Sequence, residues 1–532
     1  MDILLGIMFI TALLAFVHLF YEYKRVLMML QQNSYRNERY MRWLRASGDT
    51  TSFIRIFAMI VMFVSLISVI PSKLSVYFIL LISAVGFGKL FTAKYKKPLV
   101  FTKRVWRIFL VMMVLTIIVM ALLGWYANKT SIQNLLFVES VALLVMYVGS
   151  HIIVMTANTL LAPVEKFINK KYYNDAARIL SQMPGLKIVG ITGSYGKTST
   201  KHYLHRILSE KYDVLMTPGS FNTTLGVIRT IREYLKPYNQ VFIVEMGAKQ
   251  KGDIKEICDL VHPSMGIVTA VGEQHLESFK SIENVQSTKF ELIDALPADG
   301  LAVVNDDFEY VANRVVNNVE CQRYAVNATE NASYTAKEIE YDETGTSFTI
   351  VGNGSELKLH TRLVGECNIS NLIAAVVIAL RLDVPEEKIR YAVEKIEQVE
   401  HRLNLKRTAG GVTIIDDAFN SNPTGSHMAM DVLARFNRGQ RIVITPGMIE
   451  LGEKQYELNE SLGRKIAQCA DLAIIVGEYN REALVVGVVA GGMAKEQIKL
   501  VASFNEAQQV LATIVKSGDT VLYENDLPDT FK

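Results

Sequence analysis

The stretch KIVGITGSYGKTST, residues 187–200, contains an apolar run, a glycine-containing loop and the start of a segment with helical spacing. The run 188–191 predicts a buried strand, and residues 192–196 predict a flexible loop that leads into a helix from Lys197. Glycine allows the backbone N–H groups of such a loop to turn toward phosphate oxygens, and the helix N-terminus adds a favourable dipole. The stretch therefore predicts a cradle for the phosphates of a nucleotide.

The predicted phosphate-binding residues lie close together in this loop. They are Gly193, Ser194, Gly196, Lys197, Thr198 and Ser199. Lys197 is expected to hold the β- and γ-phosphates and Thr198 a Mg²⁺ ion. The spacing departs from the strict G-x-x-x-x-G-K-[ST] pattern, because Ile191 stands where the first glycine belongs and Gly190 comes one residue early. The alternative is a glycine-containing loop before an ordinary helix.

Hydrophobic residues make up 50% of the 532-residue chain and the mean hydropathy is +0.21, which is high for a purely soluble protein. Part of the chain is therefore expected to lie in a membrane. The formal net charge of +3 is small and gives no reason to propose a nucleic-acid partner. The four cysteines form neither a C-x-x-C pair nor a Cys/His cluster, which favours reduced thiols in a cytosolic compartment.

Residues 1–160 are predicted to form a membrane domain, because they contain five apolar runs close to the ~20 residues that span a bilayer. The runs are 3–20, 53–70, 74–91, 108–126 and 135–155. Lysine and arginine accumulate after the first run and after the third, and such residues gather on the cytoplasmic side. This pattern predicts an external N-terminus and a cytoplasmic location for everything after the last run. Glu139 and His151 in that run indicate either a functional site inside the bundle or ordinary bundle-facing polar residues.

Residues 161–398 alternate between short apolar runs and helical segments, which predicts an α/β domain with a parallel sheet and with ligand groups at the carboxyl ends of its strands. Within it, residues 332–364 change to an alternating pattern around 343–345, which predicts an antiparallel hairpin. Residues 399–532 are predicted to form a second, doubly wound α/β domain. The fold class is therefore α/β, with a multi-span helical membrane domain ahead of a P-loop domain and a Rossmann-like domain.

Three polar residues follow the predicted phosphate cradle at places where chemistry is expected. Glu245 ends the run VFIVE, so its carboxylate should emerge beside the phosphate loop as a Mg²⁺ ligand. His275 follows the next apolar run, and Lys289 comes about four helical turns later. Taken singly, each of these residue types is more often structural or at the surface than functional.

Ten motifs in order resemble the Mur ligase family, and in particular its members that add D-alanyl-D-alanine to a cell-wall precursor. The motifs are TGSYGKTST, SFNTTLG, EMGAKQKGDI, EQHLESF, STKFELI, VVNDD, GECNISNLIAA, HRLN, IIDDAFNSNP and GMIELG. The resemblance covers about residues 185–515. It implies an ATP-dependent ligase in which a carboxylate attacks the γ-phosphate and an amine then displaces phosphate from the acyl-phosphate.

The resemblance also implies roles for single residues near the phosphates. Lys197 and Thr198 match residues that bind the triphosphate and a first Mg²⁺, and Glu245 matches a ligand of that ion. His275 matches a ligand of a second Mg²⁺. Lys289 matches a lysine that is carbamylated, a change that turns an ammonium into an anion able to bind the second metal ion.

Further matches concern the rest of the nucleotide. Asn305 and Asn371 match residues on the adenine side, although Cys367 replaces the histidine that is usual before the first asparagine of the second motif. Arg402 and Asp417 match residues of the C-terminal domain that reach the γ-phosphate and the ribose. Closure of that domain would assemble the site when substrates are bound.

Asn222, Asn420 and Asn422 lie in motifs that resemble the substrate side of the family, although the last two could equally be turn residues before Pro423. Two features depart from the family. The membrane spans stand where relatives have a soluble domain for the uridine nucleotide of the precursor. Residues 523–529 are acidic where relatives have a basic K-G-S-R-like stretch, which could favour an amine or a cationic group or could be a solvated end.

The sequence thus predicts a multi-pass protein of the cell membrane whose cytoplasmic domains use ATP and Mg²⁺ to join an amino acid or short peptide to an envelope precursor. The precursor could be lipid-linked, and other envelope-assembly proteins of the membrane are candidate partners. Two alternatives stay open. One is a polymerase similar to capsular poly-γ-glutamate synthases, and the other is a membrane transporter or sensor that uses a ligase-like domain as a nucleotide switch.

Overall fold

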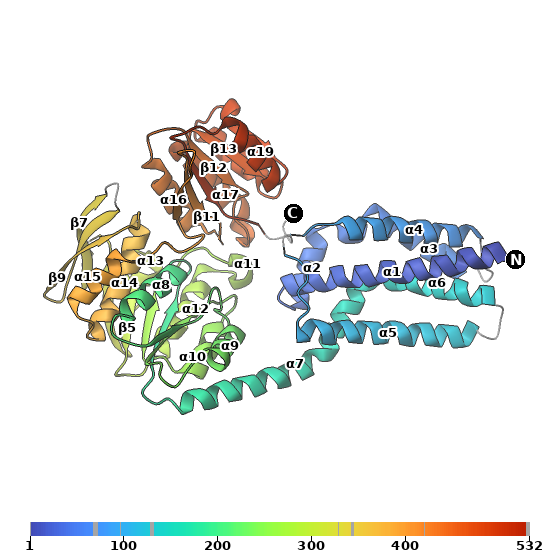
Figure 1. The fold of residues 1–532 in the computed structure, drawn as a ribbon, viewed down its shortest axis with the longest axis horizontal. Coiled ribbons are helices and arrows are strands. Elements are labelled where there is room, and N and C mark those ends of the chain that lie inside the picture. Colours follow the sequence, from blue (N-terminus) through green and yellow to red (C-terminus); the bar gives the residue numbers. More distant parts are fainter. Residues whose placement is uncertain are drawn as a thin grey trace. The chain divides into compact units, whose positions relative to one another are not determined.

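The computed structural model describes residues 2–67, 73–95, 97–127, 132–327, 329–341, 345–419 and 421–527 (Figure 1). The chain divides into two compact units, one within residues 1–169 and the other within residues 170–526. The first unit is helical, and the second contains two sheets with helices packed against them.

The first unit is a helical bundle with an apolar outer surface. Its helices are α1 (Asp2–Gln32), α2 (Asn37–Ala46), the short 3₁₀ helix η1 (Asp49–Thr51), α3 (Phe53–Ile67), α4 (Lys73–Thr92), α5 (Lys103–Ala127), α6 (Ile132–Val148) and α7 (Ser150–Ser181), which continues into the second unit. Large apolar side chains such as Phe53, Leu110 and Trp125 are more than half exposed, whereas Glu22 and Arg55 are buried. Apolar side chains outside and polar ones inside are typical of helices that face lipid.

Three helices of this unit, Ile3–Gln32, Lys73–Thr92 and Lys103–Trp125, are long and apolar enough to cross a membrane. They correspond to the first, third and fourth predicted spans. Helix α3 is shorter, with 15 residues, and positions 68–70 of the second predicted span lie outside the described residues. The fifth predicted run, 135–155, covers parts of two helices, because α6 and α7 meet at Gly149 with a bend of 72°.

The second unit begins with a nine-stranded sheet in the order β2-β3-β1-β4-β5-β6-β7-β8-β9. Its parallel strands are β1 (Lys187–Thr192), β2 (Val214–Met216), β3 (Val241–Glu245), β4 (Met265–Val268), β5 (Leu301–Asn305), β6 (Glu320–Ala325) and β7 (Tyr334–Tyr341). The strands β8 (Thr346–Gly352) and β9 (Ser355–Thr361) continue it in antiparallel fashion. The predicted parallel sheet and antiparallel extension are therefore confirmed, while positions 343 and 344 of the expected turn lie outside the described residues.

Strand β1 lies between β3 and β4, so the loop after it opens near the middle of the carboxyl edge of the sheet. Its side chains alternate between two cores: Val189 and Ile191 pack with α8 (Lys197–Leu208), α14 (Glu366–Arg381) and α15 (Glu386–Glu394). Ile188 packs on the other face with helices α9 (Thr224–Glu233), α10 (Asp253–Val261) and α12 (Ile282–Asp294). The short helices α11 (Leu276–Phe279) and α13 (Glu309–Ala312) follow β4 and β5. Both faces of a parallel sheet must be covered, which explains the continuous apolar run of β1.

The C-terminal part has a six-stranded sheet in the order β10-β11-β15-β12-β13-β14. Its strands are β10 (Asn404–Arg407), β11 (Thr413–Asp417), β12 (Arg441–Thr445), β13 (Leu472–Val476), β14 (Ile498–Val501) and β15 (Thr520–Glu524), and all pairs except β10 with β11 are parallel. Its helices are α16 (Pro423–Ala434), η2 (Gly452–Lys454), α17 (Gln455–Cys469), α18 (Arg481–Ala490), η3 (Lys495–Gln497) and α19 (Phe504–Ile514). The α/β fold class predicted for this part of the chain is confirmed.

Candidate active site

The loop after β1 contains the two glycines that the sequence predicts for a phosphate cradle. Gly193 and Gly196 adopt positive φ values of 150° and 80°. A Cβ atom at Gly193 would lie 2.1 Å from Oγ1 of Thr269, and one at Gly196 would lie 2.5 Å from Oδ1 of Asn371, so neither position accepts a side chain. Gly190 lies inside strand β1, which explains why the glycine spacing departs from the common P-loop pattern.

Lys197 is the first residue of α8, and its side chain curls back over the loop. Its Nζ donates to the carbonyl oxygens of Gly193 (2.6 Å) and Ser194 (3.3 Å). Burial lowers the pKa of Lys197 to about 8, while the charge of Glu245 raises it and that of Arg402 lowers it. The side chain is therefore still mostly an ammonium at neutral pH, and it lies where a bound phosphate would need a cation.

Glu245 ends β3 beside the loop and is the centre of a buried polar cluster. Its Oε2 accepts from Oγ1 of Thr198 (3.1 Å) and lies 3.0 Å from Nζ of Lys201, and its Oε1 accepts from Nδ2 of Asn222 (3.2 Å). Burial opposes ionisation, but the charges of Lys201 and Lys197 hold the pKa of Glu245 below its ordinary value. Sequence reasoning missed Lys201, whose signal is a lysine one helical turn after Lys197 on the buried side of α8.

The oxygen atoms of Thr198 and Glu245 fit one magnesium ion. Mg²⁺ prefers hard oxygen ligands and is commonly held by one or two protein oxygens together with substrate phosphates and water. The two side chains touch at 3.1 Å beside the phosphate loop, and Asn222 orients the carboxylate. Among the described residues no group of three or more His, Cys, Asp or Glu side chains could hold a metal ion alone, so phosphate and water would have to complete the coordination.

His275 and Lys289 are not among the residues that line the pocket described below. His275 precedes α11 in a left-handed conformation (φ 54°), and its Nδ1 forms a hydrogen bond with Glu450. Lys289 is buried on α12. Its pKa is well below the ordinary value, mainly because of burial and to a smaller extent because of the positive charge of Lys197. Lys289 in turn contributes to a lowered pKa of His275, whose first cause is burial, so the two side chains share one electrostatic environment.

Two further asparagine side chains, Asn305 and Asn371, line the pocket. Nδ2 of Asn305 donates to the carbonyl of Thr269 (2.9 Å) and to Oγ of Ser370 (2.8 Å). Oδ1 of Asn371 accepts from Oγ1 of Thr200 (3.1 Å). Both asparagines are buried. Asn305 connects the ends of β4 and β5 to α14, and Asn371 connects α14 to α8, so they give the pocket fixed walls.

The C-terminal part contributes Arg402 and Asp417. The Arg402 guanidinium lies 4.4 Å from the ring centre of Phe419 and donates to its carbonyl oxygen. Asp417 accepts from the backbone N–H of Leu403 (3.1 Å), and burial raises its pKa to about 6. Asn422 caps α16 by accepting from the N–H of Gly425 (2.9 Å). Position 420 lies outside the described residues.

One pocket collects most of the residues predicted for the site. Its lining includes Ser194, Gly196, Lys197, Thr198, Ser199, Asn222, Glu245, Asn305, Asn371, Arg402, Asp417 and Asn422. It also includes residues that the sequence reasoning missed, among them Tyr195, Gln274, Phe308, Phe419 and Ser421. Tyr195 and Phe308 pack edge to face at 5.1 Å between ring centres, and no sequence motif indicated this aromatic wall.

Comparison with known proteins explains this arrangement. Residues 191–379 match the model of the Mur ligase middle domain, and residues 401–523 match that of the Mur ligase glutamate ligase domain. Among curated relatives, the UDP-N-acetylmuramoyl-tripeptide–D-alanyl-D-alanine ligase of Bacillus subtilis is 27% identical over 353 residues, covering 65% of this chain and 75% of that protein. The Escherichia coli enzyme of the same name is 28% identical over 357 residues, covering 66% and 77%.

Solved structures agree with the sequence matches. MurF from Acinetobacter baumannii is 26% identical with a TM-score of 0.61, covering 67% of this chain and 77% of that one. MurF ligase from Thermotoga maritima, solved in complex with ADP, is 26% identical with a TM-score of 0.60, covering 67% and 80%. The N-terminal region of this chain differs from the usual nucleotide-binding domain of these relatives. The chain therefore belongs to the Mur ligase family, whose members are ATP-dependent acid–amino acid ligases that use Mg²⁺.

Proposed function

We propose that this protein is a membrane-anchored ligase that activates a carboxylate as an acyl-phosphate and joins it to the amine of an amino acid or short peptide. The acceptor carboxylate belongs to a cell-envelope precursor, with a lipid-linked precursor as the first candidate. The observation that carries the proposal is one pocket lined by the phosphate loop, the Glu245 cluster, and Arg402 and Asp417 of the C-terminal part.

In this proposal the residues around the loop bind and orient the triphosphate of ATP. The backbone N–H groups of the loop and the Lys197 ammonium hold the phosphate oxygens, and Lys201 keeps Glu245 ionised and in place. Thr198 and Glu245 would hold a magnesium ion, which supplies positive charge against the phosphates when it is bound. Asn305 and Asn371 line the side of the pocket assigned to adenine.

The reaction then needs an anionic carboxylate to approach the anionic γ-phosphate. A carboxylate oxygen forms a bond to the γ-phosphorus while the bond to the bridging oxygen breaks and ADP leaves. The amine nitrogen next attacks the acyl carbon, phosphate leaves, and the amine loses a proton to solvent. Lys197 and Arg402 reduce the repulsion between the two anions, and their fixed positions make this electrostatic help effective.

We assign Lys289 the role of a carbamate-bearing residue. Reaction with CO₂ requires a neutral amine, and burial holds the pKa of Lys289 well below its ordinary value. The carbamate would carry a negative charge close to His275, which is within electrostatic reach. An unmodified ammonium in the same place would repel a divalent cation, so the modification gives this buried lysine a function.

The apolar helices of the first unit supply the membrane anchor. Three of them are long and apolar enough to cross a bilayer, and they occupy the part of the chain where the relatives carry a different domain. A ligase held at the membrane can reach a precursor that is itself held there. This location supports a lipid-linked acceptor over the free uridine nucleotide.

The proposal is tested with purified full-length protein in detergent, ATP, Mg²⁺, candidate lipid-linked acceptors and candidate amines. ADP and phosphate should appear only when both an acceptor and an amine are present, and Glu245→Gln should abolish the release. Mass spectrometry of copurifying lipids and of the products identifies the acceptor, and a ladder of product lengths would indicate a polymerase. Formation of AMP and pyrophosphate would contradict the proposed chemistry.

A further inference from the structure

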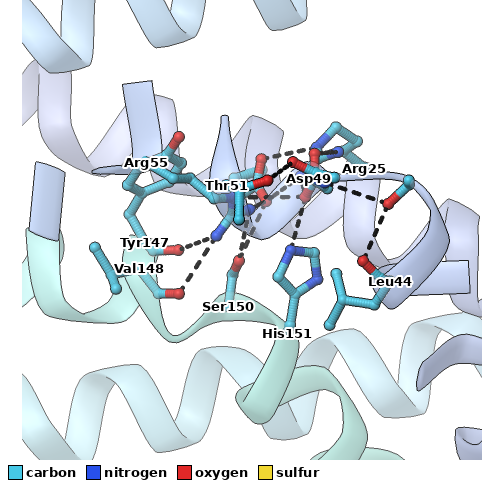
Figure 2. Close-up of polar contacts among 12 residues, drawn as sticks. Arg25, Leu44, Asp49, Thr51, Arg55, Tyr147, Val148, Ser150 and His151 are labelled. Carbon is cyan, nitrogen blue, oxygen red and sulfur yellow. Dashed lines mark hydrogen bonds and ion pairs between the residues drawn. The ribbon is translucent and has the colours of Figure 1, made fainter. Parts of the chain in front are cut away.

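Helix α6 ends at Val148 and α7 begins at Ser150, and the bend of 72° between them is surrounded by charged side chains (Figure 2). Nη1 of Arg55 donates to the carbonyl oxygens of Tyr147 (3.2 Å) and Val148 (3.3 Å). These carbonyls end α6, and the last carbonyls of a helix have no partner within it. The guanidinium therefore caps α6 at the place where the chain turns.

The first residues of α7 are tied to the same cluster. Oγ of Ser150 donates to Oε1 of Glu22 (3.1 Å), and Nε2 of His151 lies 2.8 Å from Oδ2 of Asp49. Arg25 pairs with both carboxylates, at 2.8 Å from Glu22 and 2.7 Å from Asp49. Removing one member of such a buried set leaves a charge without its partner, which costs several kcal/mol. The cluster thus fixes the direction in which α7 leaves the bundle.

Beyond the bend, one face of α7 packs on the bundle. Val154 and Ala157 are fully buried, and Nδ2 of Asn158 donates to the carbonyl of Tyr35 (2.9 Å). Glu165 accepts two hydrogen bonds from Arg107, at 2.6 Å and 2.9 Å. These contacts extend along this face from Val154 to Glu165, so α7 lies against the bundle over that range.

The opposite face is apolar and open. Ile152, Leu160, Val164 and Phe167 are 67%, 58%, 45% and 73% exposed. At about 100° per residue they fall within an arc of about 120° around the helix. Two exposed lysines, Lys170 and Lys171, lie within this arc, and the exposed Lys166 lies about 40° outside it. An apolar stripe flanked by lysines is typical of helices that lie in the headgroup region of an anionic bilayer.

We infer that α6 crosses the membrane and that α7 from Ile152 to Lys171 lies along its cytoplasmic surface. Its apolar side chains would insert between acyl chains, and its lysines would contact anionic phospholipid headgroups. The 17 residues of α6 cover about 26 Å, close to the ~30 Å of the hydrocarbon core, so α7 is not needed to complete the span. The inference rests on the membrane anchoring proposed above but not on the ligase chemistry.

The bend sets a measurable geometry. From Ile152 to Phe167 the helix advances about 22 Å along its own axis. With a bend of 72°, this advance corresponds to only about 7 Å along the axis of α6. A helix that continued across the bilayer parallel to α6 would place the two side chains about 22 Å apart in depth.

The test attaches nitroxide labels at positions 152, 160 and 167 of the full chain, after replacing the four native cysteines by alanine. The depth of each label in the bilayer is obtained from the ratio of its collision rates with oxygen and with a water-soluble nickel complex. The vesicles consist of phosphatidylcholine with or without phosphatidylglycerol. Labels at Leu110 and Ile117 on α5 report whether the bundle is in the bilayer. In anionic vesicles the α7 labels should all lie just below the phosphates and differ in depth by about 7 Å or less.

A difference in depth near 22 Å between the labels at positions 152 and 167 would overturn the inference. The inference would also fail if the α7 labels were exposed to water while the α5 labels were inside the bilayer. If the α5 labels are also in water, the membrane anchoring itself fails.

The triple variant Lys166→Gln, Lys170→Gln, Lys171→Gln tests the role of the lysines. It should lose the difference in the depth of the label at position 167 between the two vesicle types. The charge-matched triple variant Lys251→Gln, Lys495→Gln, Lys516→Gln should keep it. Photo-crosslinking of benzoylphenylalanine at position 167 in the native-cysteine chain checks the result, since it should capture phospholipid, and capture of a protein instead would overturn the inference.

Discussion

Glu524 should make the C-terminal sheet less stable as pH rises, and Glu524→Gln should remove this dependence. The carboxyl group is fully buried at the end of β15, where it accepts from Oγ1 of Thr445 (2.7 Å) and from Oγ of Ser421. Its register partner on the neighbouring strand is Asp417. Burial raises the pKa of Glu524 from 4.5 to about 7, with the hydrogen bonds acting in the opposite direction.

The direction and the size of the pH dependence of stability follow from thermodynamic linkage. A folded-state pKa above the unfolded value means that the folded state favours the protonated form. Its contribution to stability is therefore complete below about pH 4.5 and is lost as pH rises through about 7. The difference between those two pKa values corresponds to about 3–4 kcal/mol, or roughly a 300-fold change in an opening equilibrium. Glutamine has the same shape and no titration, so the variant should match wild type near pH 5 and exceed it near pH 8.

Hydrogen exchange measured by mass spectrometry on the full chain tests this locally. Trp43, Trp106 and Trp125 all lie in the first unit, so tryptophan fluorescence would not report on this sheet. Peptides covering β11 and β15 should lose protection between pH 5 and 8 in wild type, after correction for intrinsic exchange, but not in Glu524→Gln. Glu496→Gln, which changes an exposed glutamate of the same domain, is the control and should behave as wild type. Identical profiles for wild type and Glu524→Gln would refute the reasoning.

Three further predictions concern Lys289, Lys201 and Lys197. Lys289→Ala should lose most ligase activity and regain part of it with short carboxylic acids, which fill the anionic position, whereas full activity of Lys289→Arg would contradict a carbamate. Lys201→Met should lower the free energy of unfolding by about 3–5 kcal/mol in hydrogen exchange, because it leaves the Glu245 carboxylate buried without its cation. Adding Glu245→Met should restore stability but not ADP release. Since the pKa of Lys197 is about 8, its ammonium is lost above that pH and the KM for ATP should rise there, and a constant KM from pH 7 to about 9.5 would contradict its role.

The sequence was sufficient for elements whose structure depends on local pattern. The run 188–191 is apolar throughout because β1 is covered on both faces, and the loop glycines are required by contacts that a Cβ atom would violate. Glu245 could be placed beside the loop because β1 and β3 are neighbours and both end at the same edge. The order of the motifs then led to the family, which the comparisons confirm.

Other features depend on contacts between distant segments, and no local pattern encodes them. The hydrogen bond of His275 to Glu450 joins residues 175 positions apart. Lys201 resembles any helical lysine until the fold turns it onto Glu245. The run 135–155 is apolar enough for one straight span, and the bend at Gly149 becomes apparent only when Arg55 and Glu22 are seen around it. Hydropathy counts apolar residues and does not detect such a break.

In the proposed ligase reaction the γ-phosphate passes to a carboxylate of the acceptor and not to water. Turnover in ¹⁸O-labelled water, with the acceptor and amine identified from copurified material, tests it most directly. In the proposed reaction the fourth oxygen of the released phosphate comes from the acceptor carboxylate, so phosphate should contain no solvent oxygen. A nucleotide switch that hydrolyses ATP would place one ¹⁸O atom in each phosphate, and that result would contradict the ligase assignment.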